Sequence, residues 1–241
     1  MTADPDVDEF YHLLDVRVAT LTRRFSGRLP TAADLPLSKA RWTEKGVYFF
    51  FEPGESRESG DAPRVVRVGS HTGGRSTVES RIVSEHAVDW GRSVFRRHVG
   101  GALIRSGRVD RLLPSTDRER WAQSWIASRR KRAVHHRRSE LDPALHFLHS
   151  HVTGIVRQMT FVWVKVEELD TRLKLEKEAI RLLNNCHRER RVVDSASAAW
   201  LGRFAYPEEI RLSGLWNVQQ VRRPPTPGFV RSFASYFESD D

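Results

Sequence analysis

Hydrophobic and polar residues follow two different periods along this chain of 241 residues, one typical of helices and one of strands. Apolar side chains recur at helical spacing from about residue 5 to residue 26, and the run ends at Gly27. The segments GVYFFFE (46–52) and RVVRVGS (64–70) are instead rich in β-branched and aromatic residues, and a turn-rich stretch, PGESRESGDAP, separates them. This pattern predicts a β-hairpin over about residues 46 to 69.

Helices are expected after the hairpin. A Gly-Gly loop at residues 73–74 leads into a helical segment that starts at Ser76 or Thr77 and reaches about His86. Ser93 is expected to start the next helix, because serine is a favoured N-cap residue.

A third strand and further helices complete the pattern. Residues from about 117 to 157 predict two helices, broken near 139–143, and TFVWVKV (160–166) predicts a strand. Asp170 or Thr171 is expected to cap the helix that follows, and a short amphipathic helix follows the Pro-rich break RRPPTPG near the C-terminus. Strands mixed with helices predict an α+β fold, with a small three-stranded mixed or antiparallel sheet, flanking helices, a helical insertion and helical termini.

The helix in LKLEKEAIRLLNN carries a carboxylate on its apolar side. At about 100° per residue, apolar side chains cover one half of the helical wheel: Leu173, Leu175, Ala179, Ile180, Leu182 and Leu183. Glu176 falls inside that half and Glu178 falls outside it. A buried carboxylate must be paired, protonated or bound to a cation, because desolvating it alone is costly. Glu176 is therefore a candidate ligand of a hard divalent cation, and a salt bridge to Arg172 or Arg81 is the alternative.

The charge of the chain suggests a polyanionic partner. The formal net charge is +9 and the pI is about 10.3, and arginine forks match phosphate oxygens. The helix that starts at Ser93 is expected to place Arg96 and Arg97 outside its apolar arc, free for phosphate contact. A larger basic cluster with Trp121 and Trp125 upstream predicts a second surface that follows a nucleic-acid backbone: Arg129, Arg130, Lys131, Arg132, Arg137 and Arg138. The alternative is a solvated charged face in an arginine-rich protein.

Several classes of protein are disfavoured. The single cysteine, Cys186, excludes an intrachain disulfide framework and a multi-cysteine zinc site. The sequence contains neither a GxxxxGK[ST] phosphate loop nor an HExxH metal helix. The acidic N-terminus lacks the order of a secretory signal, and no apolar run approaches the roughly 20 residues that span a bilayer, so a cytoplasmic location without membrane contact is the simplest expectation.

Four short features together resemble the GIY-YIG nuclease family. They are GVY (46–48) and RVG (67–69) on neighbouring strands, Arg81 on the following helix, and Glu176 about a hundred residues later. The resemblance covers roughly residues 41 to 105 and 160 to 220. The segment WLGRFAYPEEIRLSGLWNVQQV also resembles the tail of a bacterial subgroup of uncharacterised GIY-YIG-like proteins.

This resemblance implies a domain organisation. Residues 1–40 would form an N-terminal helical extension, and residues 41–220 a GIY-YIG-like domain with a helical insertion at about 107–157. Residues 221–241 would contain the Pro-rich break and a short terminal helix.

The resemblance also implies roles for individual residues. Tyr48 would act as a general base or orient the attacking water, and Arg81 would neutralise charge on the transferring phosphate. Glu176 would bind Mg²⁺ or Mn²⁺. His86 corresponds to a histidine that often follows the family arginine, although it lies five residues after Arg81 instead of four. An asparagine that lines family sites would correspond to one of the two residues that close the Glu176 helix: Asn184 or Asn185.

One motif departs from the family pattern. Arg67 occupies the position of the second tyrosine, and it cannot act as a base because arginine stays protonated, although it can bind phosphate. His71 and His98 are further acid–base candidates. The sequence therefore predicts a metal-dependent endonuclease that acts on DNA, with RNA not excluded. The alternatives are an inactive GIY-YIG scaffold that binds nucleic acid, and a structural or partner-binding protein.

Overall fold

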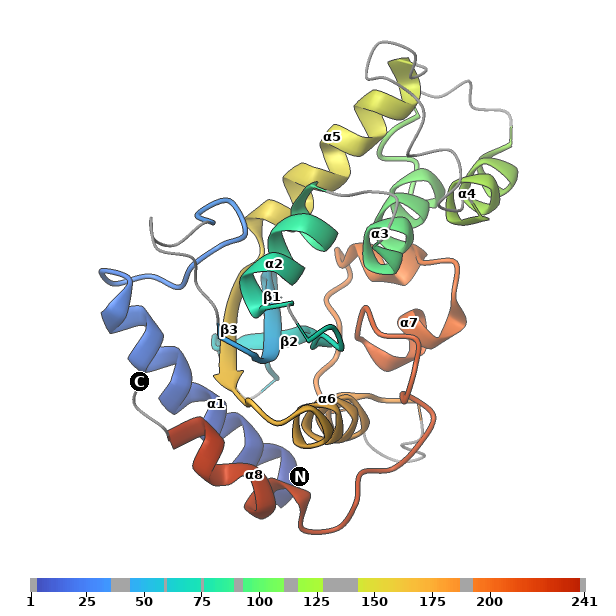
Figure 1. Cartoon of the computed structure of the whole chain (residues 1–241). Coiled ribbons are helices and arrows are strands. Elements are labelled where there is room, and N and C mark those ends of the chain that lie inside the picture. The colour runs from blue at the N-terminus through green and yellow to red at the C-terminus, as the bar shows by residue number, and fades with distance from the viewer. Residues whose placement is uncertain are drawn as a thin grey trace.

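The computed structural model describes most of the chain: residues 4–35, 44–58, 60–74, 76–88, 93–110, 117–127, 143–186 and 193–238. A three-stranded antiparallel sheet lies at its centre, in the order β2-β1-β3, with helices around it (Figure 1). The strands are β1 (Gly46–Ser56), β2 (Pro63–Gly69) and β3 (Thr160–Lys165). The α+β class, the hairpin and the third strand are therefore confirmed.

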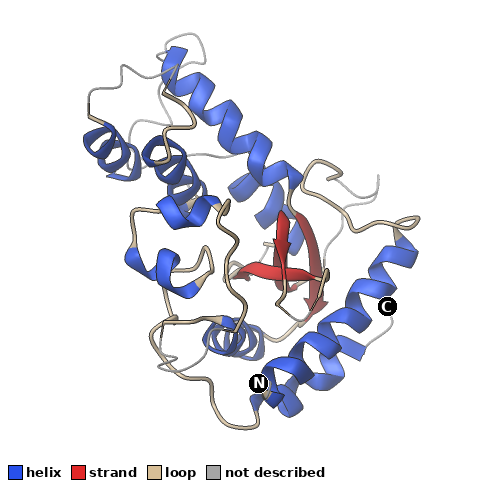
Figure 2. Ribbon diagram, turned by 180° about the vertical axis from the view of Figure 1, so that it is seen from behind, coloured by secondary structure: helices blue, strands red, loops and turns tan. Residues whose placement is uncertain are grey.

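Helices from the two ends of the chain cover one face of the sheet. α1 (Pro5–Arg24) and α8 (Phe229–Glu238) lie side by side, as Figure 2 also shows from behind. Phe49 of β1 points to this face, and its ring centroid lies 5.8 Å from that of Phe10 and 6.2 Å from that of Phe237. The terminal segments thus contribute to the hydrophobic core.

The opposite face of the sheet carries Tyr48 and Phe50, because side chains alternate along a strand. It is covered by a continuous helical segment made of α2 (Val78–Ser80) and the π-helix η1 (Arg81–Val88), and by α3 (Val94–Arg105). Phe50 stacks on Phe95 of α3 at a centroid distance of 6.2 Å. Thr77 caps α2 and Ser93 caps α3, as the sequence predicts. This second face is the one that supports the candidate site.

The remaining helices pack around these elements. They are α4 (Arg118–Ala127), α5 (Pro143–Gln158), α6 (Leu169–Leu183), the 3₁₀ helix η3 (Leu201–Phe204) and α7 (Glu208–Ser213). Helix α6 contacts β1 and β2, whereas the others pack on α3, on η1 or on one another. The predicted cap of α6 is wrong by two or three residues. Glu168 is the N-cap, because its carboxylate accepts hydrogen bonds from the backbone N–H groups of Asp170 and Thr171. Within the described ranges, no helix combines the length and the apolar content needed to cross a bilayer.

The outer edge of β2 is covered by the segment that follows α7. The Trp216 N–H donates to the Val66 carbonyl at 2.7 Å. The Asn217 side chain then accepts from the Val68 N–H at 3.1 Å and donates to the Val68 carbonyl at 2.9 Å. The pairing of β1 with β2 slips by one residue at Val66, since Phe50 is opposite Arg67 and the next residue, Phe51, is opposite Val65. This β-bulge and the covering segment fix the end of β2 where the site lies.

Candidate active site

A pocket of about 560 Å³ lies between β2, η1, α6, the start of α3 and the segment after Trp216. Arg67, Arg81 and Glu176 all line it, although they come from three different elements. Lys177 is the remaining charged residue of the described lining, and Asn217, Gln219 and Gln220 supply side-chain amides. The structure therefore brings together three of the residues that the sequence analysis singled out.

Glu176 lies on the wall of this pocket and is half-buried. One of its carboxylate oxygens accepts a short hydrogen bond from the Ser70 hydroxyl. Ser70 follows directly after β2, so the end of the hairpin orients this carboxylate. The alternative partner Arg172 donates instead to backbone carbonyls, among them that of Val166 at 2.8 Å.

The helical wheel assigned the two carboxylates of α6 to the wrong environments. Glu178 is the buried one, at 1% exposure; it pairs with Arg181 at 2.9 Å and accepts from the Thr226 N–H at 2.6 Å. The wheel cannot show that the C-terminal segment covers the side of α6 that carries Glu178. Glu176 lies on the apolar half of the wheel, but it faces the pocket. A helical wheel cannot predict a pocket, because it does not show where the packing against neighbouring elements leaves a gap.

Tyr48 packs against Gly69, which lies opposite it in the neighbouring strand. Tyr48 is fully buried, and a Cβ added to Gly69 would overlap its ring and its hydroxyl oxygen. Glycine is therefore the residue that the position requires. The Tyr48 hydroxyl lies 2.6 Å from Nε2 of His86.

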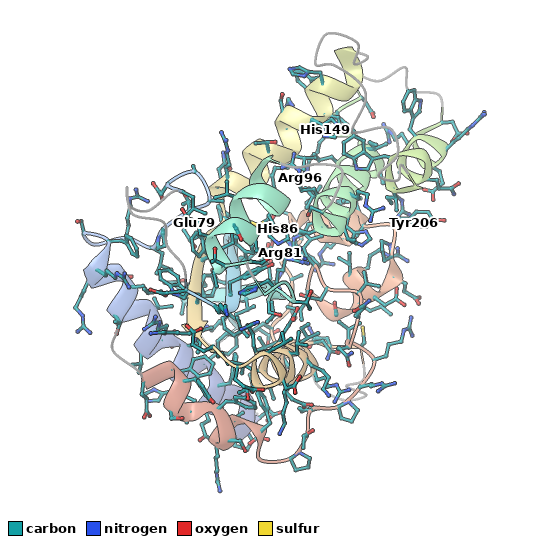
Figure 3. The ribbon with its side chains drawn as sticks, in the orientation of Figure 1. Glu79, Arg81, His86, Arg96, His149 and Tyr206 are labelled. Atoms are coloured by element: carbon teal, nitrogen blue, oxygen red, sulfur yellow. The ribbon has the colours of Figure 1, made fainter. Side chains whose placement is uncertain are left out.

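The π-helix explains how His86 joins the site despite the five-residue spacing. In η1 the hydrogen bonds join residues five apart, which brings Arg81 and His86 towards one side of the helix, as Figure 3 shows. Nδ1 of His86 lies 3.1 Å from the Ser93 hydroxyl, which also caps α3. The structure thus forms a chain of polar contacts from Tyr48 through His86 to Ser93.

His86 is a neutral imidazole at neutral pH. Its burial, and then the charges of Arg67, Arg81 and Arg96, hold its pKa well below the ordinary value. A neutral imidazole donates at one ring nitrogen and accepts at the other. In the tautomer whose Nδ1–H donates to the Ser93 hydroxyl, Nε2 of His86 accepts a hydrogen bond from the Tyr48 hydroxyl.

Arg67 connects Tyr48 with the pocket. It shares a face of the sheet with Tyr48, lines the pocket and interacts electrostatically with Tyr48 and Glu176. Its guanidinium lies 4.6 Å from the Phe95 ring centroid and donates to the Trp216 carbonyl at 3.3 Å. Burial, followed by the nearby charge of Arg81, lowers the pKa of Arg67, and the interactions with Tyr48 and Glu176 raise it. The arginine remains charged, since no protein environment deprotonates a guanidinium at neutral pH.

Of the two further histidine candidates, His98 is part of the pocket lining and His71 is not. His98 lines the pocket, and burial, followed by the charges of Arg67 and Arg97, lowers its pKa to about 4. Burial and the nearby charge of Arg172 likewise lower the pKa of His71 to about 4. His98 is thus a neutral group at the pocket wall.

Asn217 is a pocket residue that the sequence analysis missed. The expected asparagines lie elsewhere: Asn184 is buried and donates to the Ile180 carbonyl, and Asn185 donates to the Ser213 carbonyl. Asn217 belongs to the segment that resembles the tail of the GIY-YIG-like subgroup, but that resemblance assigned it no role. Its pairing with Val68 depends on a contact between residues 149 positions apart in the chain.

The expected basic surface on α3 is corrected by the structure. Arg96 is buried, at 1% exposure, and donates to the His86 carbonyl and to the Thr153 hydroxyl, both at 2.8 Å. Arg97 is half-buried and donates to the Ile126 carbonyl at 3.2 Å. The helical wheel fails here because η1, α4 and α5 pack around α3 on several sides. The cluster at 129–132 and 137–138 lies outside the described residues.

The donor set of the pocket suits a magnesium-like ion. No group of three or more His, Cys, Asp or Glu side chains comes together among the residues that the structure describes. Mg²⁺ often binds through one or two carboxylates, with water and substrate phosphate oxygens as its other ligands. Glu176, with its carboxylate on the pocket wall, fits that mode of binding.

Comparison with known proteins identifies the class. A family model described as the GIY-YIG domain matches residues 1–241, so the chain belongs to the GIY-YIG family. Membership indicates a nuclease-type function and a nucleic-acid substrate. Comparisons with curated proteins and with solved structures gave no significant match.

Proposed function

We propose that this chain is a metal-dependent endonuclease that hydrolyses phosphodiester bonds of DNA in the pocket. The observation that carries the proposal is the convergence of Arg67, Arg81 and Glu176 on one cavity, with the Tyr48–His86 pair buried behind Arg67. Among the described residues, the charged side chains of the lining are three cations and one carboxylate. That excess of positive charge favours a phosphate group.

Arg81 and Lys177 have a role in holding the substrate. A cation close to the scissile phosphate stabilises the negative charge that grows on its oxygens in the transition state. Arg81 is the better candidate for this role, because a guanidinium can donate two parallel hydrogen bonds to a phosphate. Lys177, next to Glu176 on α6, adds a mobile point charge at the same wall.

Glu176 would hold Mg²⁺ or Mn²⁺. The Ser70 hydroxyl fixes the orientation of this carboxylate, as partners of metal-binding carboxylates commonly do. When bound, such an ion polarises the phosphoryl oxygen and makes an attacking water more acidic.

Tyr48, supported by His86, would act on the attacking water. Tyr48 orients or deprotonates the water, and neutral His86 holds the phenol in place by accepting its hydrogen bond at Nε2, 2.6 Å away. Arg67 places its guanidinium charge beside the Tyr48 oxygen. In this assignment Arg67 does not replace the family tyrosine as a base but supports Tyr48 electrostatically.

The second candidate is a GIY-YIG scaffold that binds nucleic acid without cleaving it. One observation favours it: Tyr48 is fully buried and is not part of the pocket lining, whereas Arg67 is. An arginine at that wall suits phosphate binding and supplies no base.

A cleavage assay separates the two candidates. Plasmid, branched and single-stranded DNA are incubated with Mg²⁺ or Mn²⁺ and either the wild type or Glu176→Ala. We expect metal-dependent cleavage by the wild type and its loss in Glu176→Ala, with retained DNA binding. Asp170→Asn, an exposed acid on the same helix, is the matched control and keeps activity. Undiminished cleavage by Glu176→Ala refutes the site, and binding without cleavage by the wild type supports the scaffold.

A further inference from the structure

Exposed aromatic side chains gather at one place on the surface. Six large apolar side chains are exposed in the described part of the chain: Val16, Val94, Leu169, Phe204, Tyr206 and Leu212. Three of them lie in the nine residues from 204 to 212, and the two aromatic ones are Phe204, at 38% exposure, and Tyr206, at 41%. These two rings lie two residues apart in the chain, and each leaves more than a third of its surface in water, where it is accessible to a ligand.

Four arginines donate to backbone carbonyls between residues 197 and 206, and one of them, Arg105, also lies 5.9 Å from the Tyr206 ring centroid. Arg105 and Arg211 both donate to the Ala205 carbonyl at 2.8 Å, and Arg211 also donates to the Tyr206 carbonyl at 2.8 Å. Arg108 donates to the Ala199 carbonyl at 2.8 Å, and Arg203 to the Ser197 carbonyl at 2.7 Å. We call Phe204, Tyr206 and these four arginines the arginine–aromatic surface.

The positive charge of this surface is only partly compensated by carboxylates. Carbonyl groups are neutral, so the hydrogen bonds that position the guanidinium groups do not cancel their charge. Within the described ranges, Glu119 forms an ion pair with Arg105, 3.0 Å from its Nε, and Glu209 interacts electrostatically with Arg211. Arg108, Arg203 and Arg211 are exposed. A polyanion is the ligand that this charge favours.

The arginine–aromatic surface and the pocket lie at opposite ends of α3. Val94 and His98, near the start of α3, line the pocket, whereas Arg105, at its end, lies 5.9 Å from the Tyr206 ring centroid. Figure 3 shows Tyr206 at the periphery of the molecule, away from Arg81 and His86. The eleven-residue step along α3 spans about 17 Å, which is roughly five nucleotides at the spacing of one strand in a duplex.

We propose that the arginine–aromatic surface binds unpaired nucleotides that flank the bond held in the pocket. In a duplex the faces of the bases are covered by their neighbours, so only unpaired bases can stack on Phe204 and Tyr206. The arginines contact the phosphates of the same strand. The substrate class is therefore nucleic acid with a single-stranded branch or overhang about five nucleotides from the cleavage site. This inference rests on the proposed function of the pocket, but the binding is measurable without cleavage.

The test measures the affinity of the full-length protein, in EDTA, for three kinds of DNA probe. They are a blunt duplex, the same duplex with ten-nucleotide overhangs on either strand, and the ten-nucleotide strand alone. The decisive variant is Phe204→Leu/Tyr206→Leu, which keeps apolar area but removes the flat rings. We expect its affinity for the overhang probes to fall at least about fivefold, with the blunt duplex changed less than about twofold. Phe204→Trp/Tyr206→Trp is expected to bind overhangs as well as the wild type, and Leu169→Ala, exposed on α6, is the control.

The contribution of the arginines to DNA binding is measured from the salt dependence of the affinity. Arg108→Gln/Arg211→Gln is expected to lower the slope of log affinity against log salt by about 1.4 for the single strand, since each lost phosphate contact removes about 0.7. Thermal unfolding of each variant excludes a folding defect.

Two outcomes overturn the inference. One is a wild type that binds blunt and overhang probes equally. The other is a leucine variant that binds overhangs as well as the wild type, which points to an apolar protein interface instead. Loss of cleavage in every protein with retained overhang discrimination would refute the pocket assignment alone.

Discussion

The contact between Gly69 and Tyr48 gives a quantitative prediction about stability. In Gly69→Ala the new methyl group overlaps the Tyr48 ring and hydroxyl, so the tyrosine must move. Overpacking of a core costs about 1–3 kcal/mol. Moving Tyr48 also breaks its buried hydrogen bond to His86, which costs about 1–3 kcal/mol more. We therefore expect Gly69→Ala to lower the free energy of unfolding by about 2–6 kcal/mol.

Denaturant unfolding of a double-mutant cycle measures this coupling. In the Tyr48→Leu background the ring and hydroxyl atoms that the new methyl group would overlap are absent, so Gly69→Ala should cost less than about 1 kcal/mol there. The coupling free energy between the two positions is then at least about 1–2 kcal/mol.

A second glycine is a matched control. Gly154 is exposed on α5, and no heavy atom lies within 4 Å of a Cβ added there. Gly154→Ala is expected to raise stability by up to about 1 kcal/mol, because alanine favours a helix more than glycine does. If Gly69→Ala is as stable as the wild type, or if its cost is the same with and without Tyr48, the packing argument is wrong.

The other predictions concern buried groups. The pKa of His98 in the fold, about 4, lies below its ordinary value, so the native state binds fewer protons than the unfolded chain and loses stability as pH falls from about 6.5 to 4. Its share of the loss between pH 7 and pH 5 is about 2 kcal/mol, which urea unfolding of His98→Gln should remove; equal losses in both proteins contradict this. Glu178→Ala should cost about 3–5 kcal/mol, because it removes the buried carboxylate partner of Arg181 and the acceptor of the Thr226 N–H. Half-exposed Glu176→Ala should cost less than about 1 kcal/mol, and the reverse order in denaturant unfolding would contradict the burial argument.

Local sequence signals predicted the fold well. The hairpin, the third strand and the caps Thr77 and Ser93 depend on residues that are close in sequence, and the structure confirms them. Arg67, Arg81 and Glu176 could be chosen because short motifs carry them, and the pocket brings all three together.

The features that were missed depend on contacts between distant segments. Glu178, and not Glu176, is the buried carboxylate of α6, because a C-terminal segment covers that side of the helix and the Thr226 N–H donates to Glu178. Arg96 is buried because three other elements enclose α3. Asn217 reaches the pocket only because the segment after α7 pairs with β2. A helical wheel or a propensity describes one element by itself and holds no information about these neighbours.

The covering of β2 has a consequence for the order in which the protein can be completed during synthesis. The backbone groups of Val66 and Val68 at the outer edge of the sheet are satisfied by Trp216 and Asn217, which the ribosome adds about 150 residues later. Until those residues emerge, the nascent hairpin presents an open strand edge, which is a template for pairing with other chains. A chain that stops before residue 216 keeps this edge open permanently, so truncation at the C-terminus exposes the protein to aggregation as well as removing a wall of the pocket.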